Sequence, residues 1–118
     1  MKVEINGTEW TARWIHEKYE TPVLRLFGNR KGHWHEVPVK AGTICKLSIP
    51  AKPAGTISFF GFSWCSAKDN FSKQEGRKRS LQRALSRAGF AKEERQKFWA
   101  AYDAEIGVVH RQHGLVAV

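Results

Sequence analysis

Residues 56–89 decide the order of strands and helices in the fold. They read TISFFGFSWCSAKDNFSKQEGRKRSLQRALSRAG. The hydrophobic period changes inside this stretch, from alternation over residues 56–64 to an apolar stripe at helical spacing over 81–88. Between them, Ser72-Lys73-Gln74-Glu75 has the pattern of a capping box, which satisfies the first free amides of a helix, and Gly89 stands where a helix commonly ends. We therefore predict an aromatic-rich strand followed by a basic helix over about residues 72–89.

Upstream of this stretch the sequence alternates with the period of β-strands. Residues 2–5 and 8–15 flank Asn6-Gly7, the favoured pair for a two-residue hairpin turn. A loop follows the second of these strands, and further strands are predicted at 22–27, 33–39 and 43–49. In the strand at 33–39, Pro38 indicates an edge strand or a strand end.

Downstream, a second apolar stripe begins at Lys92 and predicts another helix. Gly107 interrupts it, so the helix either ends there or continues, and residues 115–118 could add a strand. The expectation is an α+β fold, with an antiparallel sheet of five or six strands followed by two helices packed on one face. At 118 residues we expect a single domain, 1–118, with the sheet in 1–65 and the helical part in 66–118.

The composition narrows the functional class. The longest apolar stretch, 57–65, is too short and too interrupted for a membrane helix, so no membrane association is expected. The N-terminus MKVEINGTEW has charged residues where a secretory signal is apolar, which predicts a cytoplasmic protein. In that compartment Cys45 and Cys65 are expected to remain reduced.

Positive charge is concentrated in one segment. The formal net charge is +9, and residues 66–90 carry seven Lys and Arg against two acidic residues. Within the predicted helix, Arg79, Arg83 and Arg87 follow each other at four-residue spacing and line one side. No acidic residue follows Glu75 in this helix, so we expect the row to lack acidic partners. Such a row suits contact with the phosphates of a polyanion, although a solvated helix face is the alternative.

We therefore predict that basic residues of the helix bind a polyanion. We also predict binding residues around the 28–32 turn, where charged side chains and a tryptophan available for stacking are expected. The candidate binding residues are Lys73, Gly76, Arg77, Lys78, Arg79, Arg83 and Arg87, with Arg30, Lys31 and Trp34.

Three aromatic residues of the predicted strand, Phe60, Phe62 and Trp64, share one face by alternation. Phe60-Gly61-Phe62 echoes the Phe-Gly-Phe centre of the RNA-recognition motif, whose sheet aromatics stack on bases. The flanking basic and glycine positions of that motif are missing, and the order of elements differs. We therefore expect these three rings to form core under the helices.

Catalytic and metal chemistry find no support in the sequence. It contains no phosphate-binding glycine loop, no nucleophile elbow and no carboxylate cluster. His33 with His35, and His110 with His113, lack the spacing of a known zinc site. We expect no catalytic residue, no metal and no cofactor.

One motif carries a family resemblance. Residues 65–85, from Cys65 through Lys68-Asp69-Asn70-Phe71 and Gly76-Arg77 to Arg83-Ala84-Leu85, resemble small uncharacterised proteins encoded by bacteriophages and prophages. The chain departs from that pattern at Ala67, where proline is frequent, and at Ser80, where an alanine commonly precedes the leucine. The resemblance covers about a fifth of the chain. It implies a virus-derived accessory protein without an assigned activity, and it places the expected cytoplasmic location in a bacterial host cytosol.

Two functions remain from the sequence. The first is a small, non-catalytic, viral-type module that contacts DNA or RNA through its arginine-rich helix. The second is a phage-encoded inhibitor of a host defence protein such as an RNA-guided nuclease, which would bind a protein or ribonucleoprotein surface in the manner of an anti-CRISPR.

Overall fold

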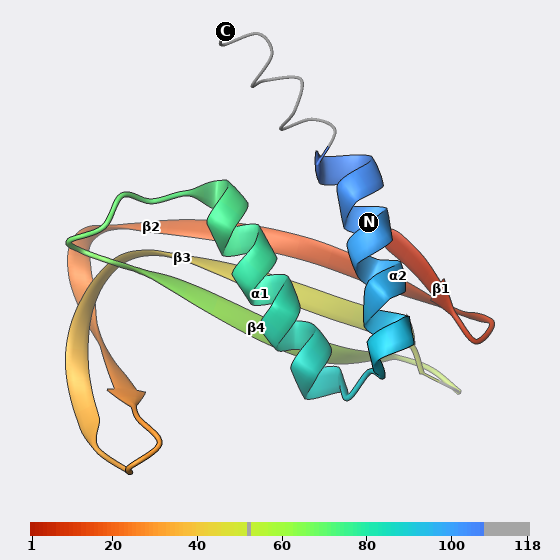
Figure 1. Cartoon of the computed structure of the whole chain (residues 1–118), viewed down its shortest axis with the longest axis horizontal. Coiled ribbons are helices and arrows are strands. Elements are labelled where there is room, and N and C mark those ends of the chain that lie inside the picture. The colour runs from red at the N-terminus through yellow and green to blue at the C-terminus, as the bar shows by residue number, and fades with distance from the viewer. Residues whose placement is uncertain (52, 108–118) are drawn as a thin grey trace, which may run out of the picture.

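The computed structural model describes residues 1–51 and 53–107. In this part of the chain, one antiparallel sheet has the order β1-β2-β3-β4, with each strand beside its neighbour in sequence (Figure 1). The strands are β1 (Lys2–Ile5), β2 (Thr8–Gly28), β3 (Trp34–Pro50) and β4 (Thr56–Ser66). Helices α1 (Lys73–Ala88) and α2 (Lys92–Tyr102) follow, and a π-helical turn, η1 (Asp103–Gly107), continues α2. The α+β class is confirmed.

The first hairpin forms as predicted. Asn6 and Gly7 both have positive φ, 51° and 78°, which a type I′ turn requires. The turn fixes the register so that Val3 lies opposite Trp10 and Ile5 opposite Thr8. Both Val3 and Ile5 are buried.

The expected number of strands, five or six, is wrong, because the described residues form four. The loop expected after residue 15 is extended, so β2 continues past a register shift between Lys18 and Val23. Pro22 falls within this shift, where no ladder partner needs its missing N–H. Likewise Pro38 lies inside β3, with its carbonyl turned away from β2 and accepting the Ala67 amide (2.8 Å). Each proline is therefore accommodated without ending its strand.

Beyond β4, the ends of β2 and β3 project as a two-stranded ribbon, residues 23–28 paired with 34–39. The ribbon bends away from the sheet and curls past the β4 edge (Figure 1). Asn29 closes its tip, since its side-chain oxygen accepts the amides of Lys31 (2.9 Å) and His33 (3.0 Å).

Helix α1 is placed by its caps and by a glycine of β4. The Ser72 hydroxyl accepts the Glu75 amide (3.2 Å), and Gly89 ends the helix with φ of 76°, both as predicted. A Cβ on Gly61 of β4 would collide with the Ser80 carbonyl oxygen and the Ala84 amide nitrogen. Gly61 therefore allows the helix backbone to lie directly on the strand.

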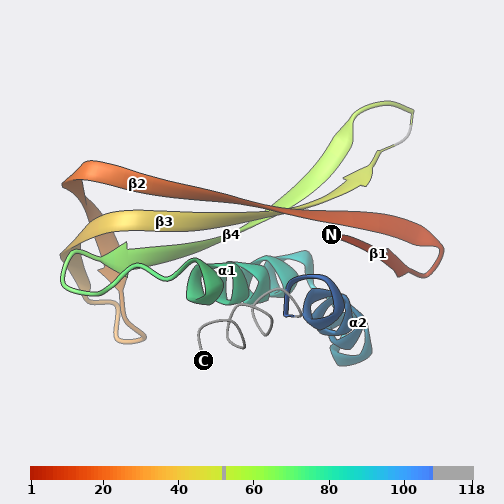
Figure 2. The ribbon, with the colours of Figure 1, turned by 90° about the horizontal axis from the view of Figure 1, so that it is seen from above.

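Both helices lie on the same side of the sheet, α1 over β4 and β3 and α2 beside β1 (Figure 2). The core between them is apolar, as the helical spacing predicts. It is formed by Val3, Ile5, Trp10, Ala12, Cys45, Leu47, Leu81, Ala84, Leu85, Phe98 and Tyr102.

No helix within residues 1–51 and 53–107 combines the length and apolar character needed to cross a membrane. The question of helix or strand after Gly107, and His110 with His113, lie outside the described residues.

Candidate functional site

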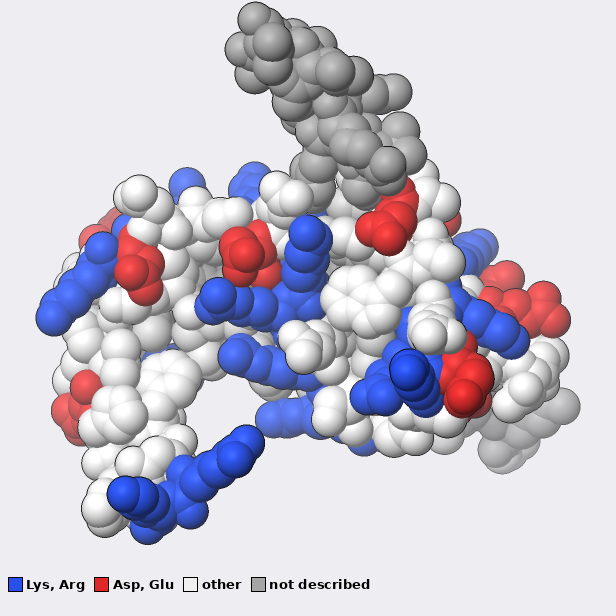
Figure 3. All heavy atoms as spheres, viewed as in Figure 1, with Lys and Arg blue, Asp and Glu red and all other residues white. Residues whose placement is uncertain are grey.

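A groove of about 710 Å³ lies where the curled ribbon faces β4 and α1. In the space-filling view, the ribbon and the body of the molecule are separated by a hollow, with Lys and Arg side chains on both sides of it (Figure 3). We call this site the ribbon groove. It is lined by Glu17, Arg25, Phe27, Ile44, Phe62, Trp64, Arg83, Ser86 and Arg87.

The aromatic wall of the groove comes from β4. Because Gly61 faces α1, the alternating residues Phe60, Phe62 and Trp64 point to the face that the helices leave uncovered. The expectation that these rings form core under the helices is therefore wrong. Phe60 is 40% exposed, and Phe62 and Trp64 are half-buried.

The three rings form a ladder with nearly parallel planes. Ring centroids are 6.5 Å apart between Phe60 and Phe62 and 5.9 Å apart between Phe62 and Trp64, with interplanar angles of 23° and 10°. Trp64 lies over Gly42, its partner on β3, where a Cβ would collide with the indole ring. Gly42 thus leaves room for the indole against the sheet.

Arg25 reaches the ladder from the ribbon. Its guanidinium carbon lies 4.5 Å from the Trp64 ring centroid, which is within the range of a cation–π contact. The ribbon thereby adds a cation to a wall built by another strand.

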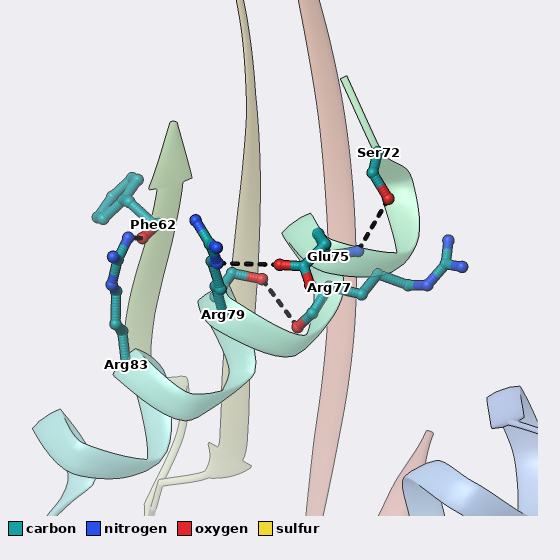
Figure 4. Close-up of polar contacts among 7 residues, drawn as sticks. Phe62, Ser72, Glu75, Arg77, Arg79 and Arg83 are labelled. Atoms are coloured by element: carbon teal, nitrogen blue, oxygen red, sulfur yellow. Dashed lines mark hydrogen bonds and ion pairs between the residues drawn. The ribbon is translucent and has the colours of Figure 1, made fainter. Parts of the chain in front are cut away.

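Two of the predicted helix arginines enter the groove from α1. The Arg83 guanidinium donates a hydrogen bond to the Phe62 carbonyl oxygen, as Figure 4 shows. One turn further along α1, the Arg87 guanidinium lies 5.8 Å from the Phe62 ring centroid. Arg83 and Arg87 are both exposed and reach the aromatic wall at the edge of the sheet.

The other arginines of α1 separate from this pair. Arg79 forms an ion pair with Glu75, Nε to Oε2 3.0 Å, so the expectation that this arginine row has no acidic partner is wrong for Arg79. Arg77 points away from Arg79 and Arg83 in Figure 4, and its carbonyl accepts the Trp14 indole N–H (3.2 Å). The three arginines at four-residue spacing therefore do not act together: Arg79 pairs with Glu75, whereas the other two line the ribbon groove.

The remaining helix candidates have different positions. Lys73 and Lys78 are exposed on α1. Gly76 is buried, and a Cβ there would collide with the Thr43 hydroxyl. Gly76 therefore lets the first turn of α1 pack closely against β3.

The three candidates outside the helix lie on the ribbon. Arg30 and Lys31 are exposed at its tip. Trp34 is 70% exposed, and its ring lies beside Gly28 across the ribbon. None of the three lines the ribbon groove.

A titratable group lies on the covered face, near the start of α1. His16 Nδ1 is 2.8 Å from the Thr43 hydroxyl, and its ring packs edge-on against Phe71 with centroids 6.0 Å apart. Partial burial, followed by the positive charges of Arg77 and Lys73, lowers the pKa of His16 below 6.5. The neutral imidazole is therefore favoured at this position.

The residues that carry the phage resemblance surround a smaller cavity of about 320 Å³. Cys65, Asp69, Phe71, Ser72 and Gly76 are among its lining residues. Ser72 caps α1 and Gly76 packs on β3, so at least these two positions build the helix start.

Among the described residues, no group of three His, Cys, Asp or Glu side chains is placed to hold a metal ion. Cys45 and Cys65 are both free thiols.

Sequence reasoning missed Arg25 as a site residue and assigned Phe62 and Trp64 to the core. The signal for the aromatic residues was present, since alternation placed them on one face. Arg25 could not be found in this way, because only the curl of the ribbon brings it to β4.

No family profile, curated protein or solved structure matches this chain.

Proposed function

We propose that this protein binds nucleic acid in the ribbon groove and acts by binding, without catalysis. The observation that carries the proposal is the convergence of three arginines on the aromatic wall. Arg25 lies over the Trp64 ring, Arg87 lies over the Phe62 ring, and Arg83 binds the Phe62 carbonyl. Guanidinium groups bind phosphates bidentately and stack on planar rings, and aromatic side chains stack on bases. The groove therefore offers both contacts that a nucleic-acid strand needs.

The charge balance of the groove supports this proposal. Among its described lining residues, three are arginines and one, Glu17, is acidic. The chain as a whole carries +9, which favours encounter with a polyanion and predicts strong dependence on salt. Lys73 and Lys78, which are exposed on α1, would extend the basic surface beyond the groove.

The test compares two triple variants that lose the same number of positive charges, one inside the groove and one outside it. Replacing Arg25, Arg83 and Arg87 together by Gln should weaken binding of short labelled DNA or RNA at least about tenfold at low salt. The control replaces three exposed basic residues of α2, Lys92, Arg95 and Lys97, by Gln. It loses the same charge but keeps the groove. Equal loss in both triple variants would contradict a groove-centred site.

As a second candidate we propose a phage-encoded inhibitor that binds a partner protein; the motif resemblance implies a virus-derived accessory protein and no particular activity. The outer face of the ribbon favours it, because Leu24, Leu26 and Trp34 are 60%, 65% and 70% exposed there. Apolar side chains gathered on a projecting arm are typical of protein contact.

Affinity capture from a nuclease-treated bacterial lysate tests this second role. A bound protein that survives nuclease, and that Leu24→Lys with Leu26→Lys abolishes, would support it. A partner that nuclease removes would instead support direct nucleic-acid binding.

A further inference from the structure

The aromatic ladder of β4 is uncovered because of how the strand meets α1. Gly61 and Ser63 face the helix and are buried, whereas Phe60, Phe62 and Trp64 face away from it. Aromatic residues that face no helix or second sheet expose apolar surface at a cost of about 25 cal/mol per Å². A binding partner that covers these rings would recover that free energy.

Planarity distinguishes the ladder from an ordinary apolar patch. The planes of Phe62 and Trp64 differ by only 10°, and Arg25 lies over the Trp64 ring at 4.5 Å. A guanidinium on an indole face shows that this face admits a flat group. A nucleobase is a flat group of the same kind, and it stacks on aromatic rings whatever its sequence.

The cations around the ladder lie at its two sides. Arg25 comes from the ribbon, and Arg83 and Arg87 come from α1. A strand lying along the groove would stack bases on Phe62 and on the Trp64 face that Arg25 covers. The displaced Arg25 would then meet its phosphates together with Arg83 and Arg87.

We infer that the ribbon groove takes single-stranded nucleic acid, with unpaired bases stacked on the β4 ladder, in preference to a duplex. This inference rests on the proposed function and specifies its substrate class. In a duplex, the base faces are occupied by neighbouring base pairs, so they cannot stack on Phe62 or Trp64. The groove volume of about 710 Å³ falls within the range of about 300–1,000 Å³ typical of pockets for small ligands, which suits a short segment of one strand.

The experiment compares one labelled oligonucleotide, single-stranded and annealed to its complement, by fluorescence anisotropy at matched salt. The single strand should bind at least about tenfold more tightly, since stacking contributes roughly 1–3 kcal/mol per base. Phe62→Leu keeps apolar bulk but removes the planar ring. It should weaken single-strand binding about fivefold to a hundredfold and duplex binding by less, so that the preference for the single strand falls.

Trp99→Leu is the matched control, because Trp99 lies on α2 and outside the ribbon groove. Circular dichroism of each variant checks that the fold is retained, and Phe60→Leu provides a second ladder variant at a more exposed position.

Three outcomes separate the inference from the proposed function. Single-strand preference that Phe62→Leu or Phe60→Leu reduces, and Trp99→Leu retains, supports the inference. Duplex binding as tight as single-strand binding, unaffected by the ladder variants, overturns the inference and leaves nucleic-acid binding standing. Failure of wild-type protein to bind either form at low salt overturns the proposed function itself.

Discussion

The Arg25 guanidinium lies 4.5 Å from the centre of the Trp64 ring, although β2 and β4 are separated in the sheet by β3. The contact exists because β2 and β3 continue beyond the register shift at Lys18 to Val23 and curl past β4. A flat sheet would keep these two residues apart. The bend in the ribbon is therefore what forms the groove.

Arg25→Gln should weaken nucleic-acid binding about threefold to tenfold, because it removes a phosphate partner. The slope of log affinity against log salt should fall by about 0.7 for a single strand. Arg25→Lys should recover the salt slope but not the full affinity, since an ammonium lacks the planar fork. Anisotropy titrations across a salt series measure both quantities. Arg95→Gln serves as the control, and an equal effect there would contradict a specific role for Arg25.

Gly61→Ala should destabilise the fold by about 1–3 kcal/mol, because its Cβ collides with the backbone of α1 at Ser80 and Ala84. Relief requires α1 to move away from β4, and this would also displace Arg83 from the Phe62 carbonyl. Urea unfolding measures the loss, with Thr56→Ala, an exposed position on the same strand, as control. An unchanged urea midpoint for Gly61→Ala would show that the helix does not lie so close to the strand.

The parts of the fold predicted from the sequence are those that depend on local rules. The Asn6-Gly7 turn, the Ser72 cap and the Gly89 stop each depend on the conformations that a few adjacent residues prefer. The predicted number of strands was wrong because β2 and β3 continue through Pro22 and Pro38. A proline breaks a strand only where its missing N–H is needed in the ladder. Whether it is needed depends on which side of the strand has a partner, and local pattern carries no such information.

The candidate site, too, was predicted only where the spacing of neighbouring residues determines it. Arg83 and Arg87 share a helix side by spacing alone, and both line the groove. Arg79 obeys the same spacing but pairs with Glu75, one turn back along the helix. Alternation grouped the β4 aromatic residues correctly but could not say which face the helices cover. That choice is made by Gly61 and Gly42, which admit a helix on one face and an indole on the other.

The two thiols should differ sharply in reactivity. Cys45 is fully buried, and burial raises its pKa to about 12, whereas Cys65 is half-buried at the end of β4. Since the thiolate is the reactive form, a thiol reagent near neutral pH should modify Cys65 and spare Cys45. Mass spectrometry of the intact protein should show one adduct in the folded state and two after unfolding in denaturant. Rapid double labelling of the folded protein would contradict the burial of Cys45.

Stability should decrease on acidification through His16. Because its pKa in the folded protein lies below 6.5, the unfolded chain binds more protons as pH falls past that value, and acid favours unfolding. The groups that face the imidazole are Arg77 and Lys73 from α1 and Thr43 from β3, so protonation also adds a cation beside two others. The contribution is complete above about pH 6.5 and is lost progressively as the pH falls toward the lowered pKa.

Urea midpoints measured from about pH 7.5 to about pH 5 should therefore fall less steeply in His16→Gln than in the wild type. His35→Gln, at an exposed position on the ribbon, should retain the wild-type slope. The Gln variant is expected to be less stable than wild type at the upper end of this range, where the neutral imidazole contacts the Thr43 hydroxyl and the Phe71 ring. If both variants followed the wild-type curve, burial beneath α1 would not be what controls the charge of His16.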